Sequence, residues 1–511
     1  MHTPIEEDEF RPARPDCSRR RPSVFWWVFA ALVFVTGLAV RLYDLADPPL
    51  DFHPTRQLHA ALIARGMLYE QDDQVPAWQR EMAVMQWRAE GLIEPQVFER
   101  LTAWSYRLAG GPDLRIPRLF AILAWMAAAV FLVWLAVDAA GSSGALAAAL
   151  FFLVWPYGVV ASRAFQPEPL VVALIAACLW AAVRWERNRG WGWAVSTGLL
   201  AGLAVFVKTV AVFFVGPALA VLVLWQGGLA RLRDRQVWAA AGLGILPSAL
   251  YYIDGVFLRG YLVTQFGGRF FPEMWIDPAF YLRWVNNLGR AVSFEIVLLA
   301  AVGAFLVRRP LYRAVLLALW GGYFIYGMAL PHHISTHDYY HLLLYPAIAL
   351  GLAGLGEAAA ARLRLSGRFA RLAAALIFLA ALAVYAYNAR TTLKRFDAAA
   401  QARVWEEIGH LLGPGASTAA LVPDYGGGLK YWGWINPALW PTENEIQWQE
   451  SLGSVSEFTA RFDEIAAGKD FFVITLFDEL ERQTELKSLL YERYPVYHQS
   501  PDYLIFDLRS P

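Results

Sequence analysis

LDFHPTRQLHAALIARGMLYE, residues 50–70, opens a long loop between the first two apolar segments. The first segment, 24–42, is long enough to cross a bilayer, and the second begins near Ile116. The intervening loop, 43–115, also contains GLIEPQVFERLTAWSYRLAGG (91–111), which predicts an amphipathic helix on the outer surface. Polar side chains near the start of the loop include Asp51, His53, Arg56, Gln57 and Arg65. Such a loop is unusual for a transporter and suits a membrane enzyme working at the outer face of a bilayer.

The composition is that of a multi-span membrane protein. Of the 511 residues, 57% are hydrophobic, and the mean hydropathy is +0.37. The 22 tryptophans suit a chain whose rings line both membrane interfaces. The formal net charge is zero, which implies no bulk attraction to nucleic acid. Cys17 lies in a polar tail and Cys178 in an apolar segment, so we expect no disulfide framework.

Eleven apolar runs have about the length of a membrane span, so the sequence predicts an α-helical polytopic membrane protein. The basic N-terminal tail precedes a full-length apolar run without a small-residue cleavage site, which we interpret as a retained first span. The predicted spans are 24–42, 116–137, 145–161, 169–183, 191–207, 210–225, 237–258, 291–307, 314–330, 342–360 and 372–388.

Arginine clusters predict the orientation of these spans. They precede the first span and follow the fourth, sixth, eighth and tenth, so all five fall on one side of the membrane. The positive-inside rule assigns that side to the cytoplasm. We therefore expect a cytoplasmic tail at 1–23, a membrane domain at 24–390 with its first loop 43–115 outside, and an extracytoplasmic domain at 391–511.

The C-terminal part predicts a small α/β domain. FFVITLF (471–477) and YLIFDL (503–508) are typical of buried strands, and ELERQTELKSLLYERY (479–494) is typical of an amphipathic helix. Earlier, VPDYGGGLKYWGWINPALWP (422–441) surrounds Asp424 with glycines and aromatic rings. Such rings suit carbohydrate stacking, and they suit equally well a loop resting on the membrane interface.

Asp51 is the first candidate for chemistry. Just beyond the first span, its carboxylate can act as a general base for a hydroxyl if the attacking oxygen is held beside it. The alternative is an ordinary turn residue after Pro48 and Pro49. Asp44 and Asp47 are competing carboxylates that lie nearer the span.

Further ionisable residues gather at the outer ends of later spans. The third span is followed by SRAFQPEPLV, which contains Arg163, Gln166 and Glu168. These residues either form a functional site or only extend their polar ends to the membrane interface. Lys208 is a lone cation between the fifth and sixth spans. Because an unpaired charge there is costly, we expect Lys208 to bind a phosphate.

A histidine-rich stretch, PHHISTHDYYHLLLYP, opens the tenth span at 331–346. His333, His337 and His341 are spaced four apart, so on a helix they would share one face. The stretch suits a metal site, packing at the interface, or hydrogen bonding to a phosphate or sugar, and we favour the last. Its other polar side chains are Asp338, Tyr339 and Tyr340.

In their order along the chain and in the side of the membrane on which they are expected, these positions resemble those of the bacterial relatives of protein O-mannosyltransferases and of aminoarabinose transferases that act on lipid A. The resemblance covers roughly residues 24–350. An acid follows span one, a surface helix runs into a Pro-Arg-Leu start of span two, an Arg and an acid follow span three, and a Lys interrupts GLAVFVKTVAVFFVGP. The residues that carry it are Asp51, Arg56, Ala61 to Gly66, Pro117, Arg118, Leu119, Arg163, Glu168, Lys208, Tyr339, Tyr340 and Pro346.

The chain also departs from that family. Phe52 follows Asp51 where the family often has Glu, and Glu168 stands where Asp is commoner. The surface helix often carries Lys-Pro-Pro, whereas residues 94–96 here read Glu-Pro-Gln.

The resemblance implies a GT-C fold and an inverting glycosyltransferase that takes sugar from a polyprenyl-phosphate donor. Asp51 would deprotonate an acceptor hydroxyl, which attacks the anomeric carbon while cations stabilise the departing phosphate. The other implied site residues are Glu168 as a second catalytic acid, Lys208, Arg163, Arg56 and His337 at the donor phosphate, and Tyr339, Tyr340, His341 and Gln166 at the substrate.

The expected partners are the lipid-linked donor, an envelope lipid, polysaccharide or protein acceptor, and the bilayer of the cell membrane. No cofactor is implied, and a divalent metal is compatible with the sequence but not required by it. The alternative is a flippase or transporter of a lipid-linked sugar. Its site would lie near the bilayer midplane, whereas the polar groups here gather in outer loops. A non-catalytic scaffold would leave Lys208 unexplained.

Overall fold

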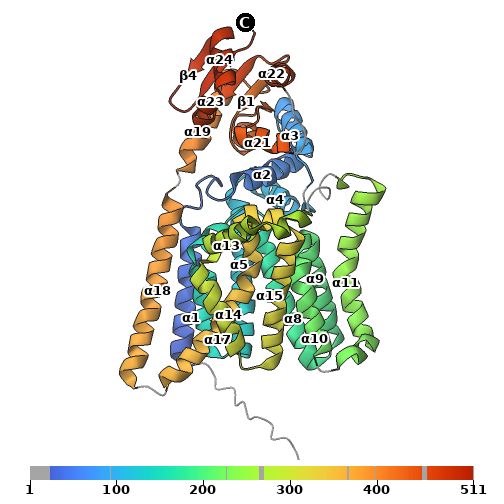
Figure 1. Cartoon of the computed structure of the whole chain (residues 1–511), viewed down its shortest axis with the longest axis vertical. Helices are drawn as coiled ribbons and strands as arrows, with labels where there is room; N and C mark the ends of the chain where they lie inside the picture. The colour runs from blue at the N-terminus through green and yellow to red at the C-terminus, as the bar shows by residue number, and fades with distance from the viewer. Residues whose placement is uncertain are drawn as a thin grey trace, which may run out of the picture.

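A bundle of apolar helices carries a smaller α/β domain at one end (Figure 1). The computed structural model describes residues 23–92, 94–225, 227–263, 270–364, 367–395, 397–451 and 457–509, and of the predicted basic tail it describes residue 23 alone. The helices of the bundle are α1 (Val24–Leu42), α5 (Arg115–Ala139), α6 (Ser142–Val154), α7 (Pro156–Ala161), α8 (Glu168–Asn188), α9 (Trp191–Val207), α10 (Val212–Leu224), α11 (Arg235–Tyr252), α13 (Pro278–Val292), α14 (Phe294–Leu306), α15 (Pro310–Ala329), α16 (Pro331–Thr336), α17 (Tyr345–Arg364) and α18 (Arg368–Lys394).

Most of these helices have the length and composition of membrane spans. Within the described residues, seven helical stretches qualify alone, and α13 with α14 forms an eighth that bends by 88° near Ser293. Three further apolar helices, α6, α9 and α10 with its preceding turn, are shorter. Ten of the eleven predicted spans lie mainly along one of these helices, whereas the span predicted at 145–161 breaks at Trp155 into α6 and α7. No predicted span contains most of α13, whose residues 278–290 fall in a predicted loop. Because three of the apolar helices are short, the number of crossings stays a prediction.

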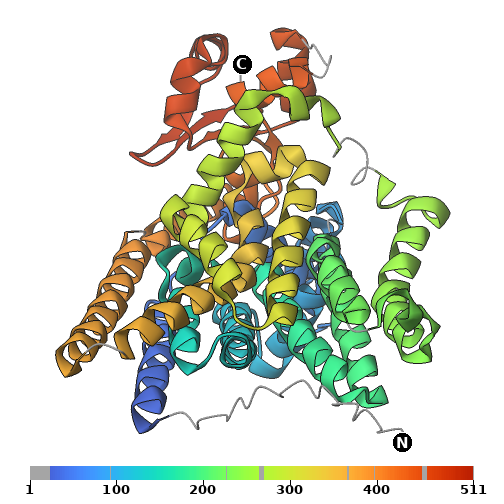
Figure 2. The ribbon, with the colours of Figure 1, turned by 60° about the horizontal axis from the view of Figure 1, so that its bottom comes forward.

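Small residues allow the helices to pack closely. A Cβ atom added to Gly303 of α14 would overlap the carbonyl oxygen of Gly351 on α17. Apolar side chains gain little by leaving lipid for a protein interior, so close backbone approach is a major source of helix association in a membrane. At the edges of the bundle, α11 packs on α9, and α18 packs on α1 and α7 (Figure 2).

The first loop folds into three helices, α2 (Pro54–Tyr69), α3 (Ala77–Ala89) and α4 (Val97–Ala109). α2 packs against α3, α4 and the C-terminal domain and is largely buried. α4 is amphipathic, as predicted: Trp104 and Leu108 are 61% and 70% exposed, while Phe98 and Tyr106 are buried. The apolar exposed side of α4 suits contact with the membrane surface.

The C-terminal domain contains one mixed five-stranded sheet in the order β2-β1-β3-β5-β4. The central strands β1 and β3 are parallel, whereas β5 pairs antiparallel with β3 and β4. The predicted strands are confirmed as β3 and β5, which lie side by side. The elements are α19 (Ala398–Leu412), β1 (Thr418–Leu421), α20 (Gly427–Tyr431), β2 (Ala438–Leu439), α21 (Glu443–Ser451), α22 (Phe458–Ala466), β3 (Phe471–Ile474), α23 (Phe477–Arg482), α24 (Thr484–Arg493), β4 (Val496–Gln499) and β5 (Leu504–Asp507).

The expectation of a single amphipathic helix at 479–494 is wrong, because the helix is interrupted between α23 and α24. Gln483 leaves the helical conformation with φ −88° and ψ 71°. Its side chain accepts a hydrogen bond from Trp440 Nε1 at 2.6 Å and donates one to the Pro441 carbonyl at 3.1 Å. These tertiary contacts fix the break, and the amphipathic pattern alone contains no sign of them.

The C-terminal domain and the first loop lie at the same end of the bundle, as predicted (Figure 1). This end, here called the capped end, is where α1 and α9 finish and α5 and α8 begin. α18 leads from the bundle to the domain and ends at Lys394. The domain boundary at 390–391, and the side of the membrane that the capped end faces, stay predictions.

Candidate functional site

Lys208 and Glu168 form a buried ion pair at the capped end. Lys208 follows the last residue of α9, and Glu168 is the first residue of α8, which packs beside α9. Each charge has the sign that its helix end favours, because the macrodipole makes the start of a helix positive and its end negative. The expectation that Lys208 is a lone cation is therefore wrong, since antiparallel packing brings it a carboxylate.

Glu94 links this pair to the first loop. Its Oε2 atom accepts a hydrogen bond from Arg56 at 2.9 Å, and its Oε1 atom lies 3.4 Å from Lys208 Nζ. Burial raises the pKa of Glu94, but Arg56 and Lys208 outweigh that effect and lower the pKa to about 2. Sequence reasoning did not place Glu94 in the site. The sequence contained one signal for this role of Glu94: residues 94–96 depart from the family's Lys-Pro-Pro, and an acid stands in place of the usual Lys.

Two tyrosine rings complete the surroundings of Lys208. The Lys208 Nζ atom lies 5.5 Å from the ring centre of Tyr339 and 5.1 Å from that of Tyr340, within range of a cation–π interaction. The structure thus brings together Lys208, Glu168, Tyr339 and Tyr340 with Arg56, as the sequence predicted for one site. We call Arg56, Glu94, Glu168 and Lys208 the charge cluster.

Buried polar atoms near the charge cluster lack a protein partner. Gln166 is 1% exposed, and neither its Oε1 nor its Nε2 atom is hydrogen-bonded to the described part of the chain. The same holds for the Oε2 atom of Glu168. Because buried polar groups are nearly always hydrogen-bonded, these atoms suit contact with water or a polar ligand.

Asp51 lies in the turn between α1 and α2. Its Oδ2 atom accepts a hydrogen bond from Arg118 NH2 at 3.1 Å, and no bond to Oδ1 occurs within the described residues. Gln57 anchors this turn by donating to the Phe52 carbonyl at 2.6 Å and accepting from the Phe165 amide at 2.8 Å. The turn thus holds one carboxylate oxygen in place and leaves the other available for chemistry.

Arg163 holds the end of α1. Its NH1 and NH2 atoms donate to the carbonyl oxygens of Tyr43 and Asp44 at 2.7 and 2.8 Å. Burial and the neighbouring Arg118 lower the pKa of Arg163 to about 10, so the side chain stays protonated at neutral pH. Both terminal nitrogens are engaged with the backbone, which gives Arg163 a structural part in shaping the Asp51 turn.

The three spaced histidines do not share a helix face, which corrects that expectation. α16 ends at Thr336, and His337 is extended with φ −127° and ψ 119° before a 3₁₀ turn begins at Asp338. His341 Nδ1 lies 2.7 Å from the Tyr323 hydroxyl inside the bundle. Among the described residues, no group of three or more His, Cys, Asp or Glu is arranged to hold a metal.

His337 carries no charge at neutral pH, because burial and the nearby His53 lower its pKa to about 4. As a neutral imidazole it can form a hydrogen bond with a phosphate oxygen but adds no positive charge. Next to it, Asp338 accepts from His53 Nε2 at 2.7 Å and thereby ties the start of α2 to the start of the tenth predicted span.

The C-terminal domain reaches this end through the loop around Asp424. Thr55 donates to Asp424 Oδ1 at 2.8 Å, and Lys430 pairs with Glu90 at 2.9 Å. A cavity of about 430 Å³ lies between the domain and the first loop. It is lined by Thr55, Arg56, His59, Leu62, Glu90, Gly91, Asp424, Tyr425, Gly427 and Lys430. Arg56 therefore contacts both the charge cluster and this cavity.

Arg65 fixes the domain on α2. Its guanidinium lies 4.4 Å from the ring centre of Tyr431 and 3.9 Å from that of Trp434. It also donates to the carbonyl oxygens of Tyr431 and Lys430. The aromatic residues of the 422–441 loop thus include two that bind a cation of the first loop, a role that sequence reasoning did not predict.

Comparisons with known proteins identify the architecture. Residues 94–252 match the family model described as dolichyl-phosphate-mannose-protein mannosyltransferase. The whole fold is similar to ArnT from Cupriavidus metallidurans bound to undecaprenyl phosphate, with a TM-score of 0.57 and 15% identity over 95% of this chain and 98% of that chain. This chain has the GT-C fold.

Two further solved structures are similar to this GT-C chain. The apo state of the same ArnT gives a TM-score of 0.57 and 15% identity, covering 94% of this chain and 97% of ArnT. The Archaeoglobus fulgidus oligosaccharyltransferase in complex with Zn and sulfate gives a TM-score of 0.48 and 12% identity, covering 94% of this chain and 73% of that one. No curated protein matches the chain.

The GT-C fold confirms the predicted fold class and the family resemblance. The apolar helices and this fold make the chain a multi-pass membrane protein. The roles of individual site residues stay predictions.

Proposed function

We propose that this chain is an inverting glycosyltransferase that moves a sugar from a polyprenyl-phosphate donor to an acceptor hydroxyl at the extracytoplasmic face. The observation that carries the proposal is the charge cluster, in which two cations, the buried Lys208 and the partly buried Arg56, lie beside a cavity and polar atoms that have no partner among the described residues. The match to a mannosyltransferase family model supports the activity, and the lipid in the ArnT structure supports the donor class.

The donor phosphate would bind at Arg56 and Lys208. Both cations are already paired with carboxylates, so a phosphate oxygen would compete with those carboxylates for them. The longest of these three contacts, 3.4 Å between Glu94 and Lys208, is the one that we expect to open. As the bond to the sugar breaks, the phosphate gains negative charge, which the two cations stabilise.

Asp51 would act as the general base. It takes the proton of the acceptor hydroxyl, the oxygen forms a bond to the anomeric carbon, and the polyprenyl phosphate leaves with the electrons of the broken carbon–oxygen bond. The hydrogen bond from Arg118 orients the Asp51 carboxylate and leaves Oδ1 for the proton. Glu168 is the second candidate acid, with its Oε2 atom unpaired among the described residues.

The acceptor would enter the cavity between the first loop and the C-terminal domain. The cavity combines carboxylates with hydroxyl, imidazole and ammonium groups, a donor and acceptor set that suits sugar hydroxyls. Tyr339, Tyr340, Gln166 and His341 remain proposed substrate contacts.

A test uses the purified full-length protein in lipid nanodiscs with defined polyprenyl-phosphate sugars. Sugar transfer to an envelope acceptor, with equal release of polyprenyl phosphate, is the expected result. Movement of intact lipid-linked sugar across a vesicle membrane without release of polyprenyl phosphate would instead show a flippase.

A further inference from the structure

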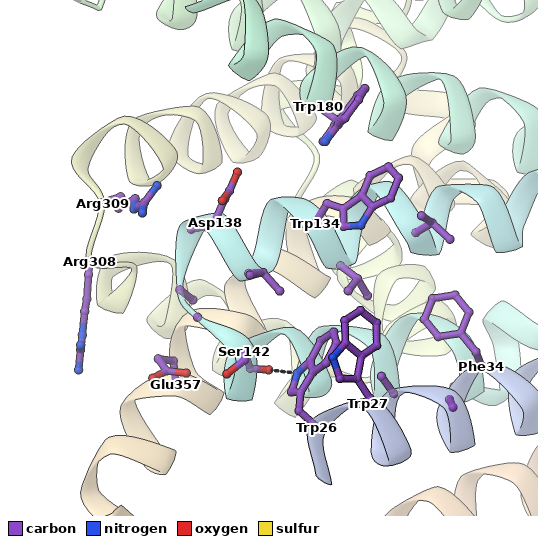
Figure 3. Close-up of a pocket in the computed structure, with 18 of the residues that line it drawn as sticks. Trp26, Trp27, Phe34, Trp134, Asp138, Ser142, Trp180, Arg308, Arg309 and Glu357 are labelled. Atoms are coloured by element: carbon purple, nitrogen blue, oxygen red, sulfur yellow. Dashed lines mark hydrogen bonds between the residues drawn. The ribbon is translucent and has the colours of Figure 1, made fainter. Parts of the chain in front are cut away.

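A second, larger cavity lies at the end of the bundle opposite the capped end. Its volume is about 1090 Å³, and its walls come from α1, α5, α6, α8, α17 and the loop before α15 (Figure 3). Four tryptophans line it, Trp26, Trp27, Trp134 and Trp180. It shares no residue with the charge cluster, because it adjoins the first turns of α1 and the last turns of α8.

The polar part of this cavity is positively charged. Arg184, Arg308, Arg309 and Arg364 line it, together with two acids. Both acids already have partners: Asp138 pairs with Arg187 at 2.9 Å, and Glu357 pairs with Arg364 at 2.5 Å.

Three of the arginines that line the cavity have a positive charge that neither acid of the cavity pairs with, so this charge is available to a ligand. The side chains of Arg308 and Arg309 form no ion pair or hydrogen bond with residues in the described ranges. The Arg184 guanidinium lies 5.4 Å from the ring centre of Trp180, and its buried Nε atom has no hydrogen-bond partner in those ranges. Trp180 likewise has a buried indole N–H that finds no acceptor in the described chain. The cavity thus offers unpaired donors and an excess of positive charge to an anion.

The opposite wall is apolar and open to the side of the bundle. Trp27 is 61% exposed and Trp134 46% exposed, although both belong to helices with the length of membrane spans. Tryptophan rings favour the membrane–water interface, and basic pockets between spanning helices bind the head groups of anionic lipids.

We propose that this cavity binds one anionic glycerophospholipid of the adjoining leaflet. Its phosphate would lie among Arg184, Arg308 and Arg309, and its acyl chains would run along Trp27 and Trp134. A polar, soluble anion would leave the tryptophan wall unused, whereas a lipid satisfies both the charge and the apolar surface. The cavity is large enough for the head group and glycerol of one such lipid.

The test uses the full-length protein in a neutral detergent with added phosphatidylglycerol or phosphatidylcholine. Native mass spectrometry counts retained lipids, and thermal unfolding measures the stabilisation that each lipid gives. We expect one tightly retained phosphatidylglycerol, and about 10-fold weaker retention in Arg308→Gln/Arg309→Gln, since charge-assisted hydrogen bonds to the phosphate are lost. The matched control is Arg368→Gln/Arg371→Gln, which removes the same charge from the first turn of α18, outside the cavity lining.

A second variant tests the apolar wall without changing the charge. Ala31 lines the cavity and is exposed, so Ala31→Phe fills space at little cost to folding. We expect it to reduce retention of phosphatidylglycerol as well. Equal losses in the cavity double variant and its α18 control would overturn the proposal, because they indicate general attraction to an anionic surface. Equal retention of phosphatidylcholine, or unchanged retention in Ala31→Phe, would also overturn it.

Discussion

The Glu94 Oε1 atom lies 3.4 Å from the Lys208 Nζ atom, so a carboxylate stands where the proposed mechanism places the donor phosphate. A phosphate must compete with this internal anion for the same cation. The contact therefore makes donor affinity depend on the loop before α4 as well as on the cations themselves.

Glu94→Gln is expected to bind polyprenyl phosphate more tightly, by about 10-fold, because it removes the competing charge and keeps the size of the side chain. Calorimetric titration of the purified protein with a short-chain polyprenyl phosphate measures this. Glu90→Gln is the matched control, since Glu90 also pairs with a lysine, Lys430, outside the charge cluster. Weaker binding by Glu94→Gln would mean that Glu94 positions the cations instead of competing for them.

Asp51→Asn is expected to lower the rate of sugar transfer by roughly 10² to 10⁴, the usual contribution of a general base. The amide keeps the shape of the side chain and can still accept the hydrogen bond from Arg118. Single-turnover rates with bound donor separate this effect from binding. Asp47→Asn is the control, because Asp47 lies in the same turn. If Asp51→Asn transfers sugar at the parental rate, the base lies elsewhere, with Glu168 as the next candidate.

Lys208→Met is expected to weaken donor binding about 10- to 100-fold through loss of a charge-assisted hydrogen bond. It also leaves Glu168 as a buried charge without its main partner, which costs about 3–5 kcal/mol of stability.

The double variant Lys208→Met/Glu168→Gln separates the two effects. It should recover most of the melting temperature that Lys208→Met loses, while donor affinity stays low. Recovery of both quantities would show that Lys208 serves only to neutralise Glu168.

Glu99 is expected to make stability depend on pH. Burial raises its pKa from the ordinary 4.5 to about 7. Between these values the carboxyl of the unfolded chain loses its proton before that of the folded protein does. The contribution of Glu99 to the free energy of unfolding therefore falls as the pH rises from about 4.5 to about 7, and it changes no further above that range. Melting temperatures in detergent should show this decline, and Glu99→Gln should remove the part that Glu99 contributes. Parallel pH curves for the two proteins would contradict the prediction.

Much of this architecture could be predicted because apolar runs and arginine clusters are local signals. They located most helices of the bundle, but missed the break at Trp155 and the helix α13, and they placed Arg56, Glu168 and Lys208 at one end of the bundle. The partners of these charges could not be predicted in the same way. The contact of Glu94 with Lys208 depends on how the first loop folds over the bundle, and no local pattern encodes that packing.

Local periodicity also failed where the chain leaves a helix. The spacing of His333, His337 and His341 predicts a shared face only if the helix continues, and it ends before His337. The break at Gln483 has the same origin, since the contact with Trp440 that fixes it comes from a distant part of the sequence.

The cation–π contacts of Arg65 with Tyr431 and Trp434 affect the order in which the protein folds during synthesis. Arg65 lies in the first loop, yet its backbone acceptor at Tyr431 is 366 positions later in the chain. During synthesis, α2 emerges long before these partners exist and cannot reach its final packing until all later spans have been synthesised. The maturation of the proposed catalytic end is therefore tied to the end of translation, because a chain that ends between residues 395 and 430 would contain every span but lack the partners that fix its first loop.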